Sequence, residues 1–170
     1  MIRVLIADDH AIVRTGLSQL IGTADDLELV GAADDGEQAV AMAAELRPDV
    51  VLMDLSMPGT DGVAATGRIV AADSSVRVVV LTSFSDQTRI LDALQAGAEG
   101  YLLKHSEPEV ILAGIREVMA GGSPLDPKAA RVLLTHRRNP GPEVKLTGRE
   151  QEVLRTTSSW SGPRVTAPRR

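Results

Sequence analysis

The chain has 170 residues and a net charge of −5; 44% of its residues are apolar, 2% are aromatic and none is cysteine. This length fits one α/β domain with a short extension and an aliphatic core, and the lack of cysteine excludes disulfides and thiolate metal sites. The opening apolar run is too short for a secretory signal, and no stretch approaches the roughly 18 apolar residues of a membrane helix. We therefore expect a soluble, cytoplasmic protein that does not bind a membrane.

The charge is unevenly distributed along the chain. Residues 1–136 contain 10 Lys/Arg and 20 Asp/Glu, a net −10, whereas residues 137–170 contain 8 Lys/Arg and 3 Asp/Glu, a net +5. An acidic body with a basic tail is typical of a regulatory part joined to a part that faces nucleic acid. A solvated basic tail explains the charge equally well, so charge alone leaves both interpretations open.

Short apolar runs alternate with helical patterns along the first 120 residues. The apolar runs predict five strands, at 2–7, 29–33, 50–54, 77–82 and 100–103. The patterns after them predict helices at 10–22, 36–46, 62–72, 86–96 and 107–120. Gly97 fits a C-terminal cap of the fourth helix, and Ser106 with Glu109 fits a capping box at the start of the fifth.

This order of elements predicts an α/β fold of (βα)5 type. Strands that are apolar on both faces and separated by single helices need cover on both sides of a parallel sheet. We therefore expect a doubly wound, parallel, five-stranded sheet formed by residues 1–121.

The remaining residues differ from this pattern. We predict a linker at 122–145, which begins with GGSPLDP, ends with RRNPGPEVK and includes a short helix at 128–136. Residues 146–155, LTGREQEVLR, predict the start of a further helix with Thr147 and Glu150 as its capping box. Residues 156–170 have no amphipathic period and a composition typical of disorder.

Polar side chains follow the carboxyl ends of the predicted strands, where open parallel sheets bind their ligands. They are Asp8 and Asp9 after the first strand, Asp54 at the end of the third, Thr82 at the end of the fourth and Lys104 after the fifth. Converging carboxylates repel one another unless a cation lies among them, and Mg²⁺ prefers hard oxygen ligands. A lysine and a hydroxyl beside them would neutralise an incoming phosphoryl group.

Each of these residues alone is a weak signal. Acids are common in loops, threonine is an ordinary strand residue, and a lone lysine is usually a solvated surface group. The set is specific because its five members lie at the carboxyl ends of four different strands. It predicts Mg²⁺-dependent transfer of a phosphoryl group to a carboxylate.

Four segments carry a resemblance to a known family: VLIADDH, VVLMDLSMPGTDG, VVVLTSFSD and GAEGYLLKHSEPEVI. In order and spacing they resemble the receiver domain of two-component response regulators, which has a flavodoxin-like fold, over about residues 1–122. The resemblance implies that Asp54 is the phosphoacceptor. It further implies that Asp9, Asp54 and the backbone carbonyl of Ser56 bind Mg²⁺ directly, with Asp8 acting through water.

The same resemblance implies roles that the residue pattern does not reveal. Thr82 and Tyr101 would form the coupled switch, and Lys104 would contact the phosphoryl group. Taken alone, Tyr101 reads as a half-buried packing residue. His105 follows the lysine where many receivers have proline, so we expect no cis peptide bond there.

The segments LTSFSD, GYLLK and LTGREQEVLR narrow the resemblance to the NarL/FixJ type, whose output is a LuxR-type helix-turn-helix. The implied partners are a sensor histidine kinase, a second copy of the chain on phosphorylation and, in the intact family, DNA. A helix-turn-helix of this type needs about 50 residues beyond Arg155 to place its recognition helix. Because 15 residues follow, we expect a truncated DNA-binding domain and the loss of specific DNA recognition.

We therefore expect a phosphorylation switch that controls transcription in the intact family and is not an enzyme. One alternative is a stand-alone module whose phosphorylation controls protein contacts. A second alternative is an aspartate-dependent phosphatase, but the D-x-D-x-T pattern of that class is absent from the first strand and from the Asp54 segment.

Overall fold

The computed structural model describes residues 1–83 and 87–138. Residues Met1–Thr135 form one compact unit, and His136–Arg170 belong to a second one. The predicted helix-turn-helix start at 146–155 and the tail at 156–170 lie outside the described residues. None of the helices in the described part combines the length and hydropathy that crossing a bilayer requires.

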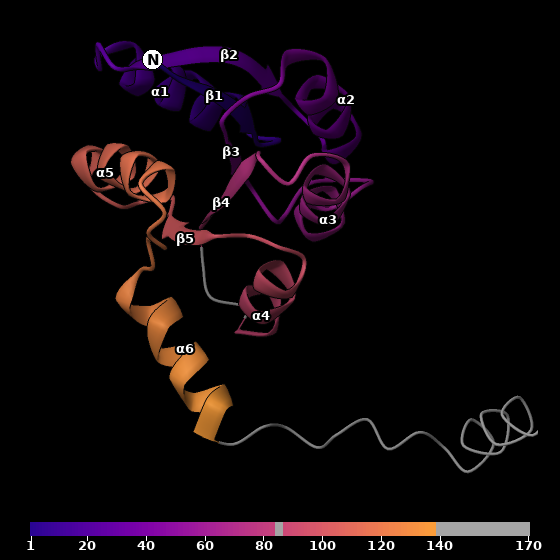
Figure 1. The fold of residues 1–170 in the computed structure, drawn as a ribbon, viewed down its shortest axis with the longest axis vertical. Coiled ribbons are helices and arrows are strands. Elements are labelled where there is room, and N and C mark those ends of the chain that lie inside the picture. The colour runs from indigo at the N-terminus through magenta and orange to yellow at the C-terminus, as the bar shows by residue number, and fades with distance from the viewer. Residues whose placement is uncertain (84–86, 139–170) are drawn as a thin grey trace, which may run out of the picture. The chain divides into compact units, whose positions relative to one another are not determined.

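The centre of the first unit is a five-stranded sheet (Figure 1). Its strands are β1 Ile2–Ala7, β2 Leu27–Ala33, β3 Val50–Met53, β4 Arg77–Thr82 and β5 Gly100–Leu103. Their spatial order is β2-β1-β3-β4-β5, and every neighbouring pair is parallel. The strand order reverses between β1 and β3, which makes the carboxyl ends of these two strands the expected ligand crevice.

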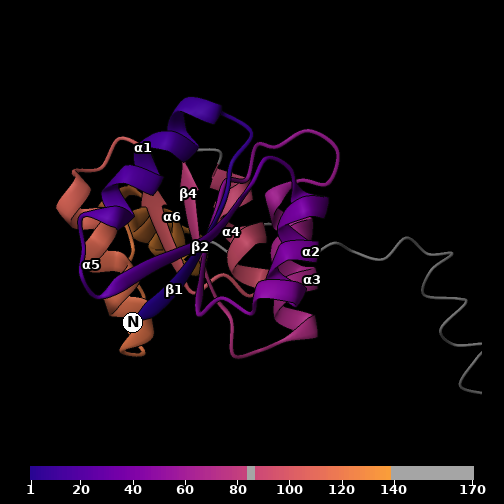
Figure 2. The same ribbon diagram turned by 90° about the horizontal axis from the view of Figure 1, so that it is seen from above.

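Helices cover both faces of this sheet. They are α1 Ala11–Gly22, α2 Gly36–Leu46, α3 Gly62–Ala72, α4 Gln87–Gln95 and α5 Pro108–Met119, followed by α6 Pro127–Arg138. Figures 1 and 2 show α1 and α5 on one side of the sheet and α2, α3 and α4 on the other. The predicted doubly wound, flavodoxin-like fold is confirmed.

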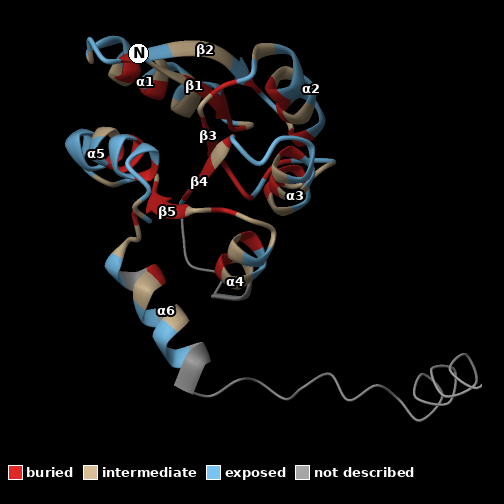
Figure 3. Cartoon of the chain, viewed as in Figure 1, coloured by how far each residue is buried: buried red, intermediate tan, exposed pale blue. Residues whose placement is uncertain are grey.

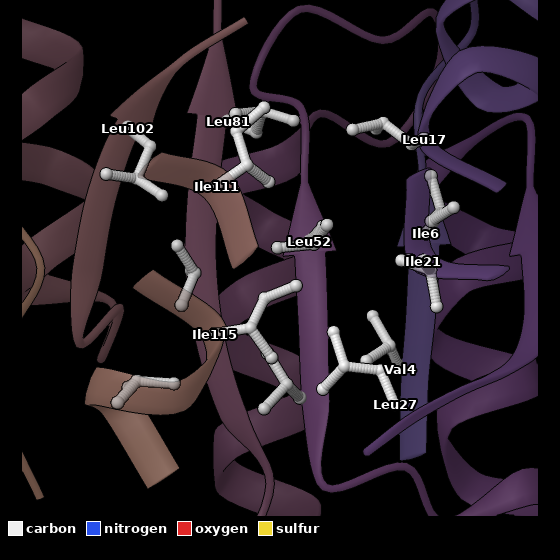
Figure 4. Packing of buried hydrophobic residues seen from close by; sticks show 13 residues of the cluster. Val4, Ile6, Leu17, Ile21, Leu27, Leu52, Leu81, Leu102, Ile111 and Ile115 are labelled. Atoms are coloured by element: carbon white, nitrogen blue, oxygen red, sulfur yellow. The ribbon is translucent and has the colours of Figure 1, made fainter. Parts of the chain in front are cut away.

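The core lies in two layers because alternate residues of each strand point to opposite faces. Along β1, Val4 and Ile6 pack under α1 and α5, whereas Leu5 packs under α2 and α3. Figure 4 shows Ile111 and Ile115 of α5 in the core layer that also contains Val4 and Ile6. Figure 3 shows the consequence: β3 and β5 are buried throughout, β1 and β4 are buried except at their first residues, and the exposed residues of the helices lie on their outer sides.

The predicted capping box at the start of α5 is wrong. The N-cap residue is Glu107, which makes no side-chain cap hydrogen bond, and Pro108 occupies the first turn. Proline favours the first helical position and drives the residue before it into an extended conformation, so the cap falls on Glu107 and not on Ser106. The predicted cap at Gly97 is confirmed: its φ is +107°, and the amides of Gly97 and Ala98 bond back to α4.

The first residues of the predicted linker pack against β5. The amide of Tyr101 donates to the carbonyl of Pro124, and the amide of Asp126 donates to the carbonyl of Tyr101, each at 2.8 Å. Ala129 of α6 is buried in the cluster that surrounds the Tyr101 side chain. The compact unit therefore extends past residue 121, and this segment covers an edge of the sheet that would otherwise expose its backbone groups.

Candidate functional site

Asp8 and Asp54 leave the sheet side by side at the crevice between β1 and β3. The preceding residues, Ala7 and Met53, are register partners, and the Asp54 amide donates to the Ala7 carbonyl at 2.8 Å. The two side chains are 2% and 1% exposed. Burial of two carboxylates this close together is costly unless cations compensate them.

Lys104 supplies one such cation. Its Nζ lies 2.6 Å from Oδ2 of Asp8 and 2.8 Å from Oδ2 of Asp54, and its side chain is 10% exposed. Burial by itself lowers the pKa of Lys104, but the contacts and negative charges of Asp54 and Asp8 outweigh it, so the pKa is raised above its ordinary value. The lysine therefore stays charged at neutral pH and bridges both carboxylates.

Asp9 and His10 complete the cluster on its solvent side. The Nδ1 atom of His10 lies 3.2 Å from Oδ1 of Asp8 and 2.8 Å from Oδ1 of Asp9, and only the first contact has hydrogen-bond geometry. One ligand atom from each of Asp8, Asp9, His10 and Asp54 falls within 4.8 Å of the others. His10 was not predicted as a site residue; its place directly after the aspartate pair is the signal that could have found it.

The donor set is compatible with Mg²⁺. Within the described residues, Oδ1 of Asp9 and both carboxylate oxygens of Asp54 are buried and lack a hydrogen-bond partner, although Nζ of Lys104 forms an ion pair with Oδ2 of Asp54. Such oxygens are costly without a partner, and a hard cation with carboxylate preference would provide it. The oxygens come from the ends of the neighbouring strands β1 and β3, where Asp9 and Asp54 could hold such an ion.

Thr82 lies at the same edge of the sheet, at the end of β4, and Tyr101 lies in the neighbouring strand, β5. Thr82 is buried at the end of β4, and its carbonyl accepts from the Lys104 amide at 2.8 Å. Tyr101 is 2% exposed in β5, where it packs with Ile90 and Ala93 of α4. The backbone thus connects Thr82 to the lysine of the site, while the tyrosine belongs to the α4 side; the coupling between the two stays a prediction.

Ser56 lies two residues beyond Asp54 in the loop before α3; it is exposed, whereas its neighbours Leu55 and Met57 are buried. A guanidinium from α4 contacts this loop: Nη2 of Arg89 donates to the Leu55 carbonyl at 2.7 Å. Gly62 allows the end of the loop to close, because a Cβ at this position would lie 1.9 Å from the Asp54 carbonyl oxygen. Arg89 was not predicted, since nothing in its own helix pattern points to a loop 34 residues earlier.

The sequence model of one protein family, described as the response regulator receiver domain, matches residues 4–116. The chain belongs to this family. The match includes every predicted site residue, so the strand-end cluster of this receiver occupies the family's own domain and not an appended segment.

Individual relatives of the receiver agree with this assignment. The chain is 43% identical over 158 residues to the transcriptional regulatory protein LiaR of Bacillus subtilis, matching 91% of this chain and 75% of that protein. It is 38% identical over 157 residues to the nitrate/nitrite response regulator protein NarL of Escherichia coli K12, matching 89% and 73%. A LuxR-family two-component response regulator from Aurantimonas sp. SI85-9A1 superimposes with a TM-score of 0.75 at 34% identity, over 81% of this chain and 98% of that one.

Proposed function

We propose that this receiver accepts a phosphoryl group on the Asp54 carboxylate from a sensor histidine kinase, with Mg²⁺ as cofactor. The observation that carries the proposal is the state of Asp54. Among the residues that the structure describes, this buried carboxylate has no hydrogen-bond partner, and it lies 2.8 Å from the Lys104 ammonium and beside two further aspartates. A carboxylate that only stabilised the fold would have its oxygens satisfied by backbone or side-chain donors.

The residues of the chain have distinct roles in the proposed transfer. An Asp54 oxygen attacks the phosphorus, an oxygen–phosphorus bond forms, and the bond between phosphorus and the donor's histidine nitrogen breaks. Asp9, Asp54 and the Ser56 carbonyl would hold Mg²⁺, with Asp8 acting through water, and the ion would neutralise charge on the phosphoryl oxygens. Lys104, already charged and aimed at Asp54, would pair with one of those oxygens.

The transfer would also set the switch. The phosphoryl group brings additional negative charge and strong acceptor oxygens to the end of β3. Lys104, now shared between Asp8 and Asp54, would move toward it, and the Thr82 hydroxyl would follow. Tyr101 would then repack against α4 and change the surface that α4, β5 and the residues after them present to partners.

We propose transcriptional control as the output in the intact family, with a phosphorylation-dependent homodimer as the active form and the cytoplasm as its location. The names of LiaR and NarL as regulators support the first point. Residues 156–170 lack the family's helix-turn-helix pattern, so we expect these 170 residues alone not to recognise a specific DNA site. Fluorescence anisotropy with a relative's operator checks this; tight, sequence-dependent binding would contradict it.

The alternatives make different predictions. A stand-alone interaction module would also be phosphorylated, and the segment packed on β5 beside Tyr101 gives it a surface that phosphorylation could change. Light scattering with and without a phosphate mimic tests for such contacts. We propose that the chain is not an enzyme; continuous hydrolysis of an external phosphate ester would instead support the phosphatase reading.

Labelling with a small-molecule phosphodonor tests the proposed acceptor. We expect acetyl phosphate to add one phosphoryl group to the wild-type chain in the presence of Mg²⁺, and none after chelation with EDTA. Asp54→Asn should abolish the addition, whereas Asp34→Asn, at an exposed acid of the β2–α2 loop, should not change it. Continued labelling of Asp54→Asn, measured by intact mass, would show that the acceptor is a different residue.

A further inference from the structure

Arg89 contacts the loop that follows Asp54, between β3 and α3, and the proposed mechanism assigns it no role. Its guanidinium, on α4, reaches three acceptors of the loop between β3 and α3. Nη2 lies 2.7 Å from the Leu55 carbonyl and 3.3 Å from Oδ2 of Asp61, and Nη1 lies 3.4 Å from Oγ of Ser56. The side chain is 31% exposed, so water competes only in part for these contacts.

The shortest contact goes to the residue next to Asp54. The Leu55 carbonyl accepts both from Arg89 and from the Gly62 amide, the latter at 3.2 Å, so two donors fix the peptide that precedes Ser56. The third contact goes to the side chain of Ser56, at its hydroxyl oxygen. Together these contacts hold the peptide between Leu55 and Ser56 and the Ser56 side chain, next to the carbonyl that the proposed metal site requires.

Asp61 extends the same contact to α3. Its Oδ1 caps α3 by accepting from the Ala64 amide at 2.9 Å, and its Oδ2 faces Arg89. The arginine therefore joins α4 to a loop that is anchored at both ends, by Leu55 after β3 and by the cap of α3. A planar guanidinium with donors in a fixed fork can hold several acceptors at once, which a lysine ammonium cannot do with the same geometry.

We propose that Arg89 is a positioning residue for the Mg²⁺ site, which holds the Leu55–Ser56 backbone in the conformation that presents the Ser56 carbonyl to the metal. This inference rests on the proposed function, because it takes Asp54 and its neighbours as the metal site. Residues that orient metal ligands from behind commonly change metal affinity 10–100-fold when they are lost. Charge repulsion alone predicts the opposite change in Mg²⁺ affinity, because removing the positive charge of Arg89 near the site would strengthen Mg²⁺ binding.

The test compares Mg²⁺ affinity, by isothermal titration calorimetry, across wild type, Arg89→Lys, Arg89→Ala and Arg68→Ala. Arg68 is a control for the loss of a guanidinium elsewhere, because its partner is Glu37 of α2. Glu37 also accepts from Thr60 at the far end of the loop, so this control leaves the Leu55 and Ser56 contacts of Arg89 in place. We expect both Arg89 variants to bind Mg²⁺ about tenfold more weakly and Arg68→Ala to bind like wild type. Asp61→Asn keeps the cap acceptor and the Leu55 contact, so its affinity should stay close to wild type.

A metal-free measurement separates this proposal from the proposed function. Deuterium uptake of the segment 54–57 should rise in both Arg89 variants and not in Arg68→Ala, with similar unfolding midpoints. Wild-type protein that binds no Mg²⁺ would contradict the proposed function, and the uptake would still show whether Arg89 holds the loop. The proposal is overturned by Arg89→Lys that behaves like wild type, by Arg89→Ala that binds Mg²⁺ as well or better, or by unchanged uptake in both.

Discussion

Lys104 sits between two buried carboxylates, and its position makes it both a structural and a functional residue. Without the ammonium, Asp8 and Asp54 would face each other as unpaired buried anions. Breaking a buried ion pair on one side costs about 3–5 kcal/mol in general. A bound metal ion at the same carboxylates would offset much of this cost, so the effect of losing the lysine depends on Mg²⁺.

We therefore expect Lys104→Met to lose about 3 kcal/mol of unfolding free energy in EDTA and much less at saturating Mg²⁺. The variant should still be folded in Mg²⁺ but fail to change its surface after phosphorylation. Urea unfolding under both conditions measures the difference. A variant that remains unfolded in Mg²⁺ would show that Lys104 is needed for the fold itself.

Some residues of the site could be predicted from the sequence, and others could not. Asp8, Asp54 and Lys104 were predictable because each follows its own strand, and a parallel sheet brings such ends together. His10 and Arg89 were missed for a different reason in each case. His10 precedes a helix like any capping residue, and Arg89 reaches the site only because α4 packs beside the β3–α3 loop, a tertiary contact that no local pattern encodes.

At the scale of elements, strong local signals were enough to place most boundaries. The bounds of α2 and α3 match the prediction because Asp35 and Asp61 cap them, each accepting from the amide three residues on. The start of β2 was missed by two residues because Glu28 interrupts the apolar run, yet this residue lies exposed on the edge strand. The predicted capping box at α5 was wrong because Pro108 in the first turn places the N-cap at Glu107 and not at Ser106.

The attachment of residues 124–126 to β5 depends on the absence of a side chain at Gly100. A Cβ there would lie 2.7 Å from Cγ of Pro124. We expect Gly100→Ala to destabilise the protein by about 1–3 kcal/mol, because a packed site must shift to admit the methyl group, and to speed the exchange of the Tyr101 amide that donates to Pro124.

Hydrogen exchange and thermal unfolding check this expectation against Gly16→Ala. Gly16 lies in α1 with open space around its Cα, so alanine there should be neutral or slightly stabilising. Equal, small effects of the two substitutions would mean that the segment after α5 is not held by this contact.

The ion pair between Asp26 and Arg116 ties the start of β2 to α5. Nε and Nη2 of Arg116 each lie 2.7 Å from one carboxylate oxygen, and this hydrogen-bonded fork is the main cause that lowers the pKa of Asp26 and raises that of Arg116. Because the folded-state pKa of Asp26 is depressed, the stabilisation is present above the unfolded-state pKa and is lost as the pH falls through the folded value. Both side chains are exposed, so the contribution is small.

We therefore expect Arg116→Ala to destabilise the protein slightly at pH 7 and to be indistinguishable from wild type once the pH has fallen through the lowered folded-state pKa of Asp26. Chemical unfolding of both proteins across this range measures the difference. A difference that stays constant or grows on acidification would contradict the ion-pair explanation.

At the scale of the whole molecule, the parallel sheet with helices on both faces determines where the site lies. The fold and the receiver family were predictable from residues 1–122, because motif order and strand-end chemistry agree there. The transcription-regulating subfamily was predictable only with the further motif at residues 146–155. The segment after residue 121 was harder to read: a Gly- and Pro-rich composition suggested a linker, yet part of it packs on β5 and buries Ala129 beside Tyr101. Tyr101, the predicted switch residue of β5, and the segment that follows α5 thus share one hydrophobic cluster.

The most direct test is to locate the phosphoryl group chemically. Wild-type protein would be treated with acetyl phosphate and Mg²⁺, the acyl phosphate reduced with labelled borohydride, and the labelled residue identified by peptide sequencing. Our account predicts label at Asp54 alone, none without Mg²⁺, and none in Asp54→Asn. Label at Asp8 or Asp9, or no label under conditions in which the protein binds Mg²⁺, would contradict it.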